Sequence, residues 1–282
     1  MQISKEFTTE QLYNKLVEGI KSYFKGCGCT KAVLGLSGGI DSAVVAVLAA
    51  KALGKENVHG IMMPSEFSTL HSIQDAVDLA ENLGIGYNVV SISEIYNRFM
   101  RELIPVFAHH RSWSTAEENL QARIRGTILM AYANKFGALV LNTSNKSELC
   151  AGYGTLYGDL AGAIMVIADI YKCDIYELAY YMNREGEVIP TSTLTKAPSA
   201  ELRKNQKDTD SLPDYQDMDP ILYALNEEGK TFQQLEAEGV DKELLERIKK
   251  LTAASSFKIH QIPPILNVSS KPLVYKEKQL LK

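Results

Sequence analysis

The sequence lacks the features that define membrane-spanning, secreted and nucleic-acid-wrapping proteins. Its longest strongly apolar run, residues 43–50, is far shorter than the roughly 20 residues that a membrane-spanning helix needs. The N-terminal residues are polar and contain no signal-peptide hydrophobic region, so we expect a cytoplasmic protein with no membrane partner. The net charge is only −4 over 282 residues, with both signs interspersed, which argues against a nucleic-acid partner.

Cysteine is scarce, and its spacing does not fit a structural zinc site. Of the four cysteines, Cys27 and Cys29 form C-x-C rather than C-x-x-C, and no His or Cys pair elsewhere completes a ligand set. We therefore expect free thiols in a reducing compartment. Internal repeats and low-complexity tracts are also lacking. What is present, 45% hydrophobic and 23% charged residues, is typical of a globular chain.

Short apolar runs alternate with helical patterns along the first half of the chain. Apolar spacing predicts helices over residues 8–24, 42–53, 73–83, 95–103, 116–135, 219–228 and 242–254. Apolar runs predict strands over residues 32–36, 58–63, 87–92 and 138–142. Three of these runs are continuous rather than alternating, as in strands that are buried on both faces.

This alternation predicts an α/β fold, a doubly wound and mostly parallel sheet flanked by helices, with extra helices near the C-terminus. Ligands bind such sheets outside the carboxyl ends of the strands, so the residues that follow Leu36, Met63 and Asn142 should line one crevice. Residues 186–217 carry three prolines and no sustained period. A segment of this length within a compact domain is more often a functional loop than a simple connection.

Residues 37–42, Ser-Gly-Gly-Ile-Asp-Ser, lie between a predicted strand and a predicted helix. Gly38 and Gly39 let the backbone approach phosphate oxygens, and the helix N-terminus directs free N–H groups at an anion. The Lys of a Walker A loop is missing, and Asp41 stands in its place. A carboxylate at a polyanion site makes sense as a ligand of Mg²⁺ that bridges the phosphates. We therefore predict an ATP site formed by Ser37, Gly38, Gly39, Ile40, Asp41 and Ser42.

Further polar residues open the long helix and follow the strand end at Asn142. Asn119 and Arg123 lie four residues apart and share one helix face. Glu148 could supply a second carboxylate to the metal that Asp41 binds. The alternative interpretations are a solvated helix face and an ordinary turn with a surface acid.

Six ordered motifs resemble those of NAD synthetases over nearly the whole chain: SGGIDS, EN-x-QAR-x-R, T-x-NKSE, GY-x-TLYGD, PSAEL and LPDY. The first motif alone resembles the loop of the ATP pyrophosphatases, which cleave ATP between its α and β phosphates. The resemblance implies an adenine nucleotide alpha hydrolase-like fold. It also implies that ATP adenylates deamido-NAD, and that ammonia then displaces AMP to give NAD, with Mg²⁺ as cofactor.

The resemblance also assigns roles to residues by motif match. The expected catalytic residues are Asp41, Asp159 and Lys172, with Asp159 near the nicotinate, where it would attract ammonium. ATP would contact residues 37–42 together with Thr143, Lys172 and Ser199. Deamido-NAD would contact Asn119, Arg123, Asp159 and Lys258, and Mg²⁺ would bind Asp41 and Glu148. Residues 191–217 resemble the loop that orders over bound substrate.

Partners follow from the same resemblance. The family is homodimeric, with the long helix near the interface. The motifs are closest to the synthetase part of glutamine-dependent enzymes, but residues 1–282 leave no room for a glutaminase domain. We therefore expect a single synthetase domain that uses free ammonia or ammonia from a separate glutaminase. Where the family carries a basic stretch near the C-terminus, only Lys258 and His260 are basic here, and we expect an extended tail from residue 257.

Three interpretations stay open at this stage. Leu36, Met62 and Met63 are either adenine contacts or core residues. A tRNA-thiolating ATP pyrophosphatase is the main enzymatic rival, against which the net charge and the missing C-x-x-C argue. A nucleotide sensor without catalysis is the other rival, and the intact set of acids with Lys172 argues against it.

Overall fold

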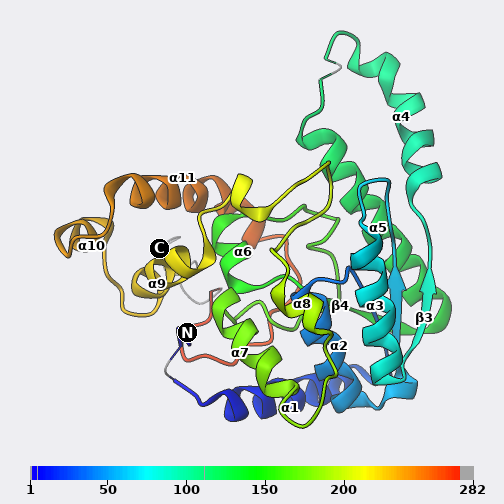
Figure 1. Cartoon of the computed structure of the whole chain (residues 1–282), viewed down its shortest axis with the longest axis horizontal. Coiled ribbons are helices and arrows are strands. Elements are labelled where there is room, and N and C mark those ends of the chain that lie inside the picture. The colour runs from blue at the N-terminus through cyan, green and yellow to red at the C-terminus, as the bar shows by residue number, and fades with distance from the viewer. Residues whose placement is uncertain (1, 5, 111, 274–282) are drawn as a thin grey trace.

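The computed structural model describes residues 2–4, 6–110 and 112–273. In this part of the chain the centre is a five-stranded parallel sheet in the order β3-β2-β1-β4-β5 (Figure 1). The strands are β1 Lys31–Gly35, β2 Val58–Met62, β3 Gly86–Val89, β4 Ala138–Asn142 and β5 Ile164–Met165. The strand order reverses between β1 and β4, which creates a crevice at their carboxyl ends. The predicted doubly wound α/β fold is confirmed.

Helices cover both faces of this sheet, which explains the continuous apolar runs. One face packs against α1 (Thr9–Cys27), α2 (Ile40–Leu53), α3 (Leu70–Leu83) and α7 (Lys172–Met182). The other packs against α4 (Ser93–Phe107) and α5 (Thr115–Phe136). Within β1, Leu34 belongs to the first layer and Val33 to the second, so neighbouring side chains are buried on opposite sides.

A second group of helices lies beside the sheet domain (Figure 1). It consists of α9 (Tyr215–Asn226), α10 (Phe232–Ala237) and α11 (Lys242–Ile259), which share a core with α6 (Lys146–Ala151) and the start of α7. The short helix α8 (Thr191–Thr195) and the 3-10 turns Lys55–Asn57 and Asp208–Asp210 complete the described elements. Among the helices in the described residues, none has the length and apolarity to cross a membrane.

Two differences from the sequence-based expectations concern the second half of the chain. The helices α6, α7, α8 and α10 and the strand β5 were not predicted. The extended tail was expected to begin at residue 257, which is wrong because α11 continues through Ile259. The first residue that forbids a helix is Pro263, and beyond it the chain runs alongside β5, where the Leu266 N–H donates to the Met165 carbonyl at 3.0 Å. Residues 274–282 lie outside the described chain.

Candidate active site

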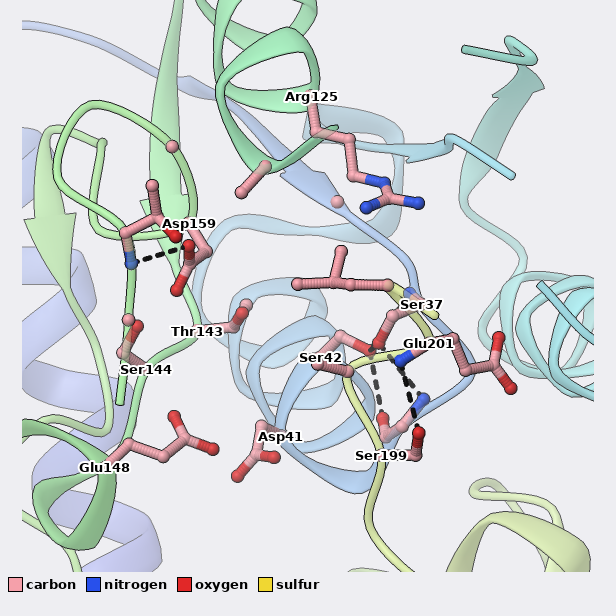
Figure 2. A pocket seen from close by; sticks show the side chains of 18 of the residues that line it. Ser37, Asp41, Ser42, Arg125, Thr143, Ser144, Glu148, Asp159, Ser199 and Glu201 are labelled. Carbon is pink, nitrogen blue, oxygen red and sulfur yellow. Dashed lines mark hydrogen bonds between the residues drawn. The ribbon is translucent and has the colours of Figure 1, made fainter. Parts of the chain in front are cut away.

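A cavity of about 680 Å³ opens at the carboxyl ends of β1, β2 and β4. Its walls include Ser37 after β1, Met63 after β2 and Thr143 after β4. The three strand ends that the sequence analysis assigned to one crevice therefore do line one cavity. Residues 196–202 form another wall of the same cavity (Figure 2).

The loop between β1 and α2 presents backbone donors to this cavity. Gly38 has a φ of +76°, and a Cβ there would lie 2.1 Å from the carbonyl oxygen of Ser72, so the position requires glycine. Gly39 precedes α2 and makes no side-chain capping bond, which leaves first-turn N–H groups available. The Ser42 hydroxyl donates to the Gly39 carbonyl at 2.9 Å, and the Gly39 N–H donates to Ser37 Oγ at 3.2 Å. These bonds hold the loop in a form that suits an anion.

Three charged side chains from α2, α6 and α7 meet beside this loop. Lys172 Nζ donates to Asp41 Oδ2 and lies 3.9 Å from Glu148 Oε1. Burial works to lower the pKa of Lys172, but the two carboxylates outweigh it and raise the pKa. Burial and then the charge of Asp41 raise the pKa of Glu148 well above its usual range, although Lys172 opposes them. Two carboxylates thus face one cation, and negative charge is in excess.

This pair of carboxylates fits a divalent cation. The carboxylates of Asp41 and Glu148 face one another (Figure 2), and Asn145 holds both. Its Nδ2 donates to Asp41 Oδ1 at 3.1 Å, and its backbone N–H donates to Glu148 Oε2 at 3.2 Å. Carboxylate oxygens with uncompensated charge are ligands that Mg²⁺ takes, together with phosphates and water. The described ranges contain no group of three or more His, Cys, Asp or Glu side chains that could hold a metal ion.

A buried carboxylate on α9 fixes the relative positions of α6 and α7. Asp219, which is 0% exposed, accepts hydrogen bonds from Ser147 Oγ at 2.6 Å and from the Cys173 N–H at 2.9 Å. The same Ser147 oxygen accepts a bond from the Lys172 N–H at 2.9 Å. Because Glu148 follows Ser147, this three-way contact positions both Lys172 and Glu148.

A buried ion pair on the other side of α6 extends the support to the C-terminal segment. Lys146 Nζ lies 3.0 Å from Asp169 Oδ1 and 2.6 Å from Glu227 Oε1, and its side chain is 1% exposed. Asp169 Oδ2 accepts bonds from the N–H groups of Val268 and Ser269 at 3.0 and 2.8 Å. The start of α6 is therefore linked both to α9 and to residues 268–269.

The loop between α6 and β5 carries Asp159 into the cavity. Thr155 donates its N–H to Asp159 Oδ1 at 2.9 Å, and Asn142 Nδ2 donates to the Asp159 carbonyl at 2.6 Å. The side chain is open to the cavity, but the surrounding wall removes it from bulk water and raises the pKa of the Asp159 carboxyl. This shift brings the carboxyl closer to the range in which it can accept a proton.

Lys258 on α11 reaches the same part of the cavity. Its Nζ donates to the carbonyls of Gly152 and Gly154, each at 2.7 Å. Burial lowers the pKa of Lys258, while the charge of Asp159 opposes the shift. The ammonium group of Lys258 thus binds the loop that precedes Asp159, and Lys258 also lines the cavity.

The two α5 residues assigned to deamido-NAD lie differently. Asn119 lines the cavity, and its Oδ1 accepts a bond from Thr155 Oγ1 at 2.7 Å. Arg123 is exposed, its Nε donates to the Leu156 carbonyl at 3.2 Å, and it is not among the residues that line the cavity. Its role in binding stays a prediction.

The wall formed by residues 196–211, which we call the covering segment, lacks regular structure apart from one 3-10 turn. Ser199 lines the cavity from this segment, and its hydroxyl donates to the Gln206 carbonyl at 2.6 Å. The functional loop that the sequence analysis expected over residues 191–217 is thus divided between α8, the covering segment and the start of α9.

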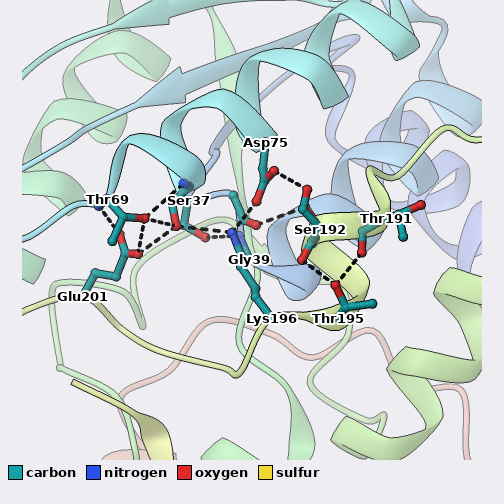
Figure 3. A network of polar contacts seen from close by, with 12 residues as sticks. Ser37, Gly39, Thr69, Asp75, Thr191, Ser192, Thr195, Lys196 and Glu201 are labelled. Carbon is teal, nitrogen blue, oxygen red and sulfur yellow. Dashed lines mark hydrogen bonds and ion pairs between the residues drawn. The ribbon is translucent and has the colours of Figure 1, made fainter. Parts of the chain in front are cut away.

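The covering segment is tethered to the first turns of α3 (Figure 3). Glu201 accepts bonds from Ser72 Oγ at 2.7 Å and from the Thr69 N–H at 3.2 Å. Lys196 Nζ lies 2.7 Å from Asp75 Oδ2, in an ion pair whose lysine is 30% exposed. The segment is therefore fixed by side-chain bonds, several of which water can reach.

Arg125 and Asp208 are among the cavity residues that were not assigned a role from the sequence. Arg125 on α5 lines the cavity and donates its Nε–H to the Met63 carbonyl at 3.0 Å. Asp208 lines it too and accepts bonds from the hydroxyls of Tyr153 and Tyr215 at 3.3 and 3.0 Å. Arg125 is the last residue of the motif EN-x-QAR-x-R, so a signal was present. Nothing in the sequence indicated which of its two arginines faces the cavity.

The fold is a doubly wound α/β nucleotide-binding fold, and its loop at residues 37–42, which we call the phosphate loop, carries an acid where a Walker A loop has a lysine. The family model described as NAD synthase matches residues 12–262, and the chain belongs to this family. The resemblance drawn from the six motifs is therefore confirmed.

Known relatives fall into two length classes. A protein named glutamine-dependent NAD(+) synthetase from Synechocystis sp. is 50% identical over 263 residues, which are 93% of this chain and 47% of that protein. The chain spans about half the length of the curated relatives it matches. By contrast, the match to the structure of an NH3-dependent NAD synthetase from Campylobacter jejuni spans 100% of that protein and 93% of this chain. The two are 32% identical, and the TM-score is 0.74. An NMN synthetase from Francisella tularensis is also covered to 100%, with 95% of this chain, 30% identity and a TM-score of 0.77.

Proposed function

We propose that this chain catalyses the ATP-dependent amidation of deamido-NAD to NAD through an adenylated intermediate. The observation that carries the proposal is the cluster of Asp41, Glu148 and Lys172 beside the phosphate loop, in a cavity that Asp159 also lines. Membership of the NAD synthase family supports the same reaction. A tRNA-thiolating enzyme is not favoured, because that chemistry would need a reactive cysteine pair.

In the first half-reaction the pyridine carboxylate attacks the α-phosphorus of ATP, and pyrophosphate leaves. The free N–H groups at the start of α2 and the hydroxyls of Ser37 and Ser42 would hold the pyrophosphate. Lys172 would stabilise the negative charge that develops on the phosphate oxygens, because it is buried and its raised pKa keeps it protonated. Mg²⁺, when bound by Asp41 and Glu148, would neutralise phosphate charge.

In the second half-reaction ammonia attacks the adenylated carbonyl carbon, and AMP leaves. The mixed anhydride makes this step feasible, because a free carboxylate is a poor acyl donor. Asp159 would attract ammonium and accept its proton, which the raised pKa of its carboxyl favours. The covering segment would exclude water that otherwise hydrolyses the adenylate.

The nitrogen donor in this proposal is ammonia, either free or released by a separate glutaminase. The full coverage of the Campylobacter jejuni protein, which is described as NH3-dependent, supports this assignment. We accordingly propose that residues 1–282 act as one synthetase domain in the cytoplasm.

The quaternary structure that we propose is a homodimer, with a second copy of this chain on the α4–α5 corner that projects from the body (Figure 1). Apolar side chains there are unusually open, with Phe99 47% and Val106 74% exposed. Arg123 on α5 points outside the cavity of one chain, which suits a dinucleotide that reaches across an interface. Light scattering on the wild type and on Phe99→Glu tests this proposal, which a monomeric wild type would refute.

The reaction is tested by incubating the protein with ATP, Mg²⁺, deamido-NAD and ammonium, and by quantifying NAD, AMP and pyrophosphate. We expect the three products in equal amounts. ADP in place of AMP, or AMP without NAD, would refute the proposal. A parallel assay with nicotinate mononucleotide measures whether the chain shares the activity named for the Francisella tularensis protein.

A further inference from the structure

The guanidinium group of Arg125 lies at the cavity, and its terminal N–H groups have no hydrogen-bond acceptor among the described residues. Arg125 is half-buried on α5, and its Nε–H donates to the Met63 carbonyl at the end of β2. In the described residues no Asp or Glu lies within 4 Å of its guanidinium. Burial lowers the pKa of Arg125 to about 10, and the more distant carboxylates of Asp159 and Glu201 offset only part of that effect. A desolvated cation of this kind is costly unless something binds it.

The other cations of the cavity are already engaged. Lys172 pairs with Asp41 and Lys196 with Asp75. Lys258 donates to two backbone carbonyls. Arg125 differs because its hydrogen bond within the described residues uses Nε, which leaves the terminal nitrogens directed into the cavity (Figure 2). A planar guanidinium fixed at Nε presents these donors in a set direction, so the expected partner is a bound ligand.

The place of Arg125 in the sheet indicates which part of the ligand it meets. It is anchored at the end of β2, whereas the loop that carries Asp159 is held at the end of β4. The phosphate loop follows β1, which lies between these two strands. The same side of the cavity offers the apolar side chains of Met62, Met63 and Leu36. A nucleotide whose terminal phosphates occupy the loop would therefore place its nucleoside near Arg125 and the apolar wall.

We infer that Arg125 binds the AMP portion of ATP, the part that the reaction transfers, and does not contact the pyrophosphate portion. This inference rests on the proposed use of ATP. A guanidinium can donate both to a phosphate oxygen and to the acceptor nitrogens of a purine, and it can stack on the ring. Arg125 would thus keep the adenylate in place after pyrophosphate has left.

Calorimetric titration with AMP and with pyrophosphate, each with Mg²⁺, tests the inference without NAD synthesis. For Arg125→Gln we expect AMP to bind about 10- to 100-fold more weakly, which is the usual loss for a charge-assisted hydrogen bond. Pyrophosphate affinity should change less than about twofold, a difference well under 1 kcal/mol. Lys135→Gln, at the exposed end of the same helix, is the matched control and should bind both as the wild type does.

A second readout separates ligand binding from a structural role. For Arg125→Ala we expect that added guanidinium ion restores part of the AMP affinity, which repair of a packing defect would not do. If Arg125→Gln does not fold, Arg125→Lys serves instead, because it keeps the charge without the planar guanidinium. This variant should bind AMP more weakly and pyrophosphate as the wild type does. Equal losses for AMP and pyrophosphate, or unchanged AMP affinity, would overturn the inference. A wild type that does not bind ATP would instead overturn the proposed function.

Discussion

Two walls of one cavity are built in different ways. The wall formed by residues 37–42 and the starts of α6 and α7, which we call the sheet-side wall, is held by contacts such as those of Asp219 and Lys146, which are 0% and 1% exposed. The covering segment is held through Glu201 and Lys196, whose side chains are partly exposed. Buried pairs are costly to break, whereas exposed ones contribute up to about 1 kcal/mol each. The sheet-side wall is therefore the more firmly held of the two, and the covering segment is held by contacts that are easier to break.

The largest expected effect falls on the sheet-side wall at Asp41. Asp41→Asn removes the charge that pairs with Lys172 and that would bind Mg²⁺, so we expect AMP release to fall by at least about 10²-fold to 10³-fold. The fold should persist because the side chain keeps its shape and Glu148 still faces Lys172. Product quantification measures the loss, and circular dichroism checks the fold. Turnover near that of the wild type would remove Asp41 from the site.

Asp219 should show that the same wall depends on a residue outside the cavity lining. Asp219→Ala leaves the Ser147 hydroxyl and the Cys173 N–H without their acceptor, which should lower the free energy of unfolding by about 3 kcal/mol. Asp219→Asn keeps one acceptor and should lose less. Urea denaturation gives the stability. A fall in kcat with an unchanged KM in the Asn variant would mark a positioning role, whereas unaltered stability of the Ala variant would contradict the comparison.

Glu148, in contrast to Asp219, should destabilise the folded protein at neutral pH. Because the folded-state pKa of Glu148 is raised, the folded protein retains a proton that the unfolded chain releases. This group therefore lowers stability as pH rises above about 4.3, the ordinary pKa of Glu, and continues to do so up to its folded pKa. Glu148→Gln should consequently be more stable than the wild type at neutral pH, by on the order of 1 kcal/mol.

The gain in Glu148→Gln should disappear below about pH 4, where both states of the wild type are protonated. Added Mg²⁺ should reverse the order at neutral pH, because a ligand that binds only the folded state stabilises it. Thermal unfolding with and without Mg²⁺, over a pH series, measures both effects. A melting temperature of the wild type that does not respond to Mg²⁺ would argue against the proposed metal site.

The smallest effect is expected at the covering segment. Glu201→Ala removes the acceptor for Thr69 and Ser72, so the segment should open more often while global stability falls by about 1 kcal/mol or less. We expect KM for ATP to rise a few-fold and proteolysis within residues 196–211 to accelerate. Asp78→Ala, at a partly exposed position of α3, is the control. A loss of stability comparable with that of Asp219→Ala would mean that the two walls do not differ.

Sequence reasoning was most reliable where local pattern and burial agree. The strand Ala138–Asn142 was predicted with its observed bounds, because an apolar run that ends in polar residues has few other interpretations. The helices α6 and α7 were not predicted, since each begins at a lysine that is almost fully buried, Lys146 and Lys172. Their partners Asp169 and Asp41 are 23 and 131 residues away in the sequence, so nothing local reveals why a lysine should be buried there.

The candidate site divides in the same way. Residues 37–42 could be read directly, because glycines and a helix N-terminus carry their chemistry in the local sequence. The tether from Glu201 to Ser72 spans 129 residues, and the orientation of Arg125 depends on Met63 at the end of another strand. These contacts are set by how the elements pack, which a pattern of residue types does not encode.

The contacts of Asp169 have a consequence for synthesis of the chain. Chains emerge N-terminus first, and contacts between distant residues form late. The phosphate loop and β4 can assemble early, but the backbone donors that Asp169 binds belong to Val268 and Ser269. Until those residues emerge, Asp169 lacks two of its partners while Lys146 adjoins the site. A nascent chain can therefore form the loop at residues 37–42 well before the contacts that hold the start of α6 are complete.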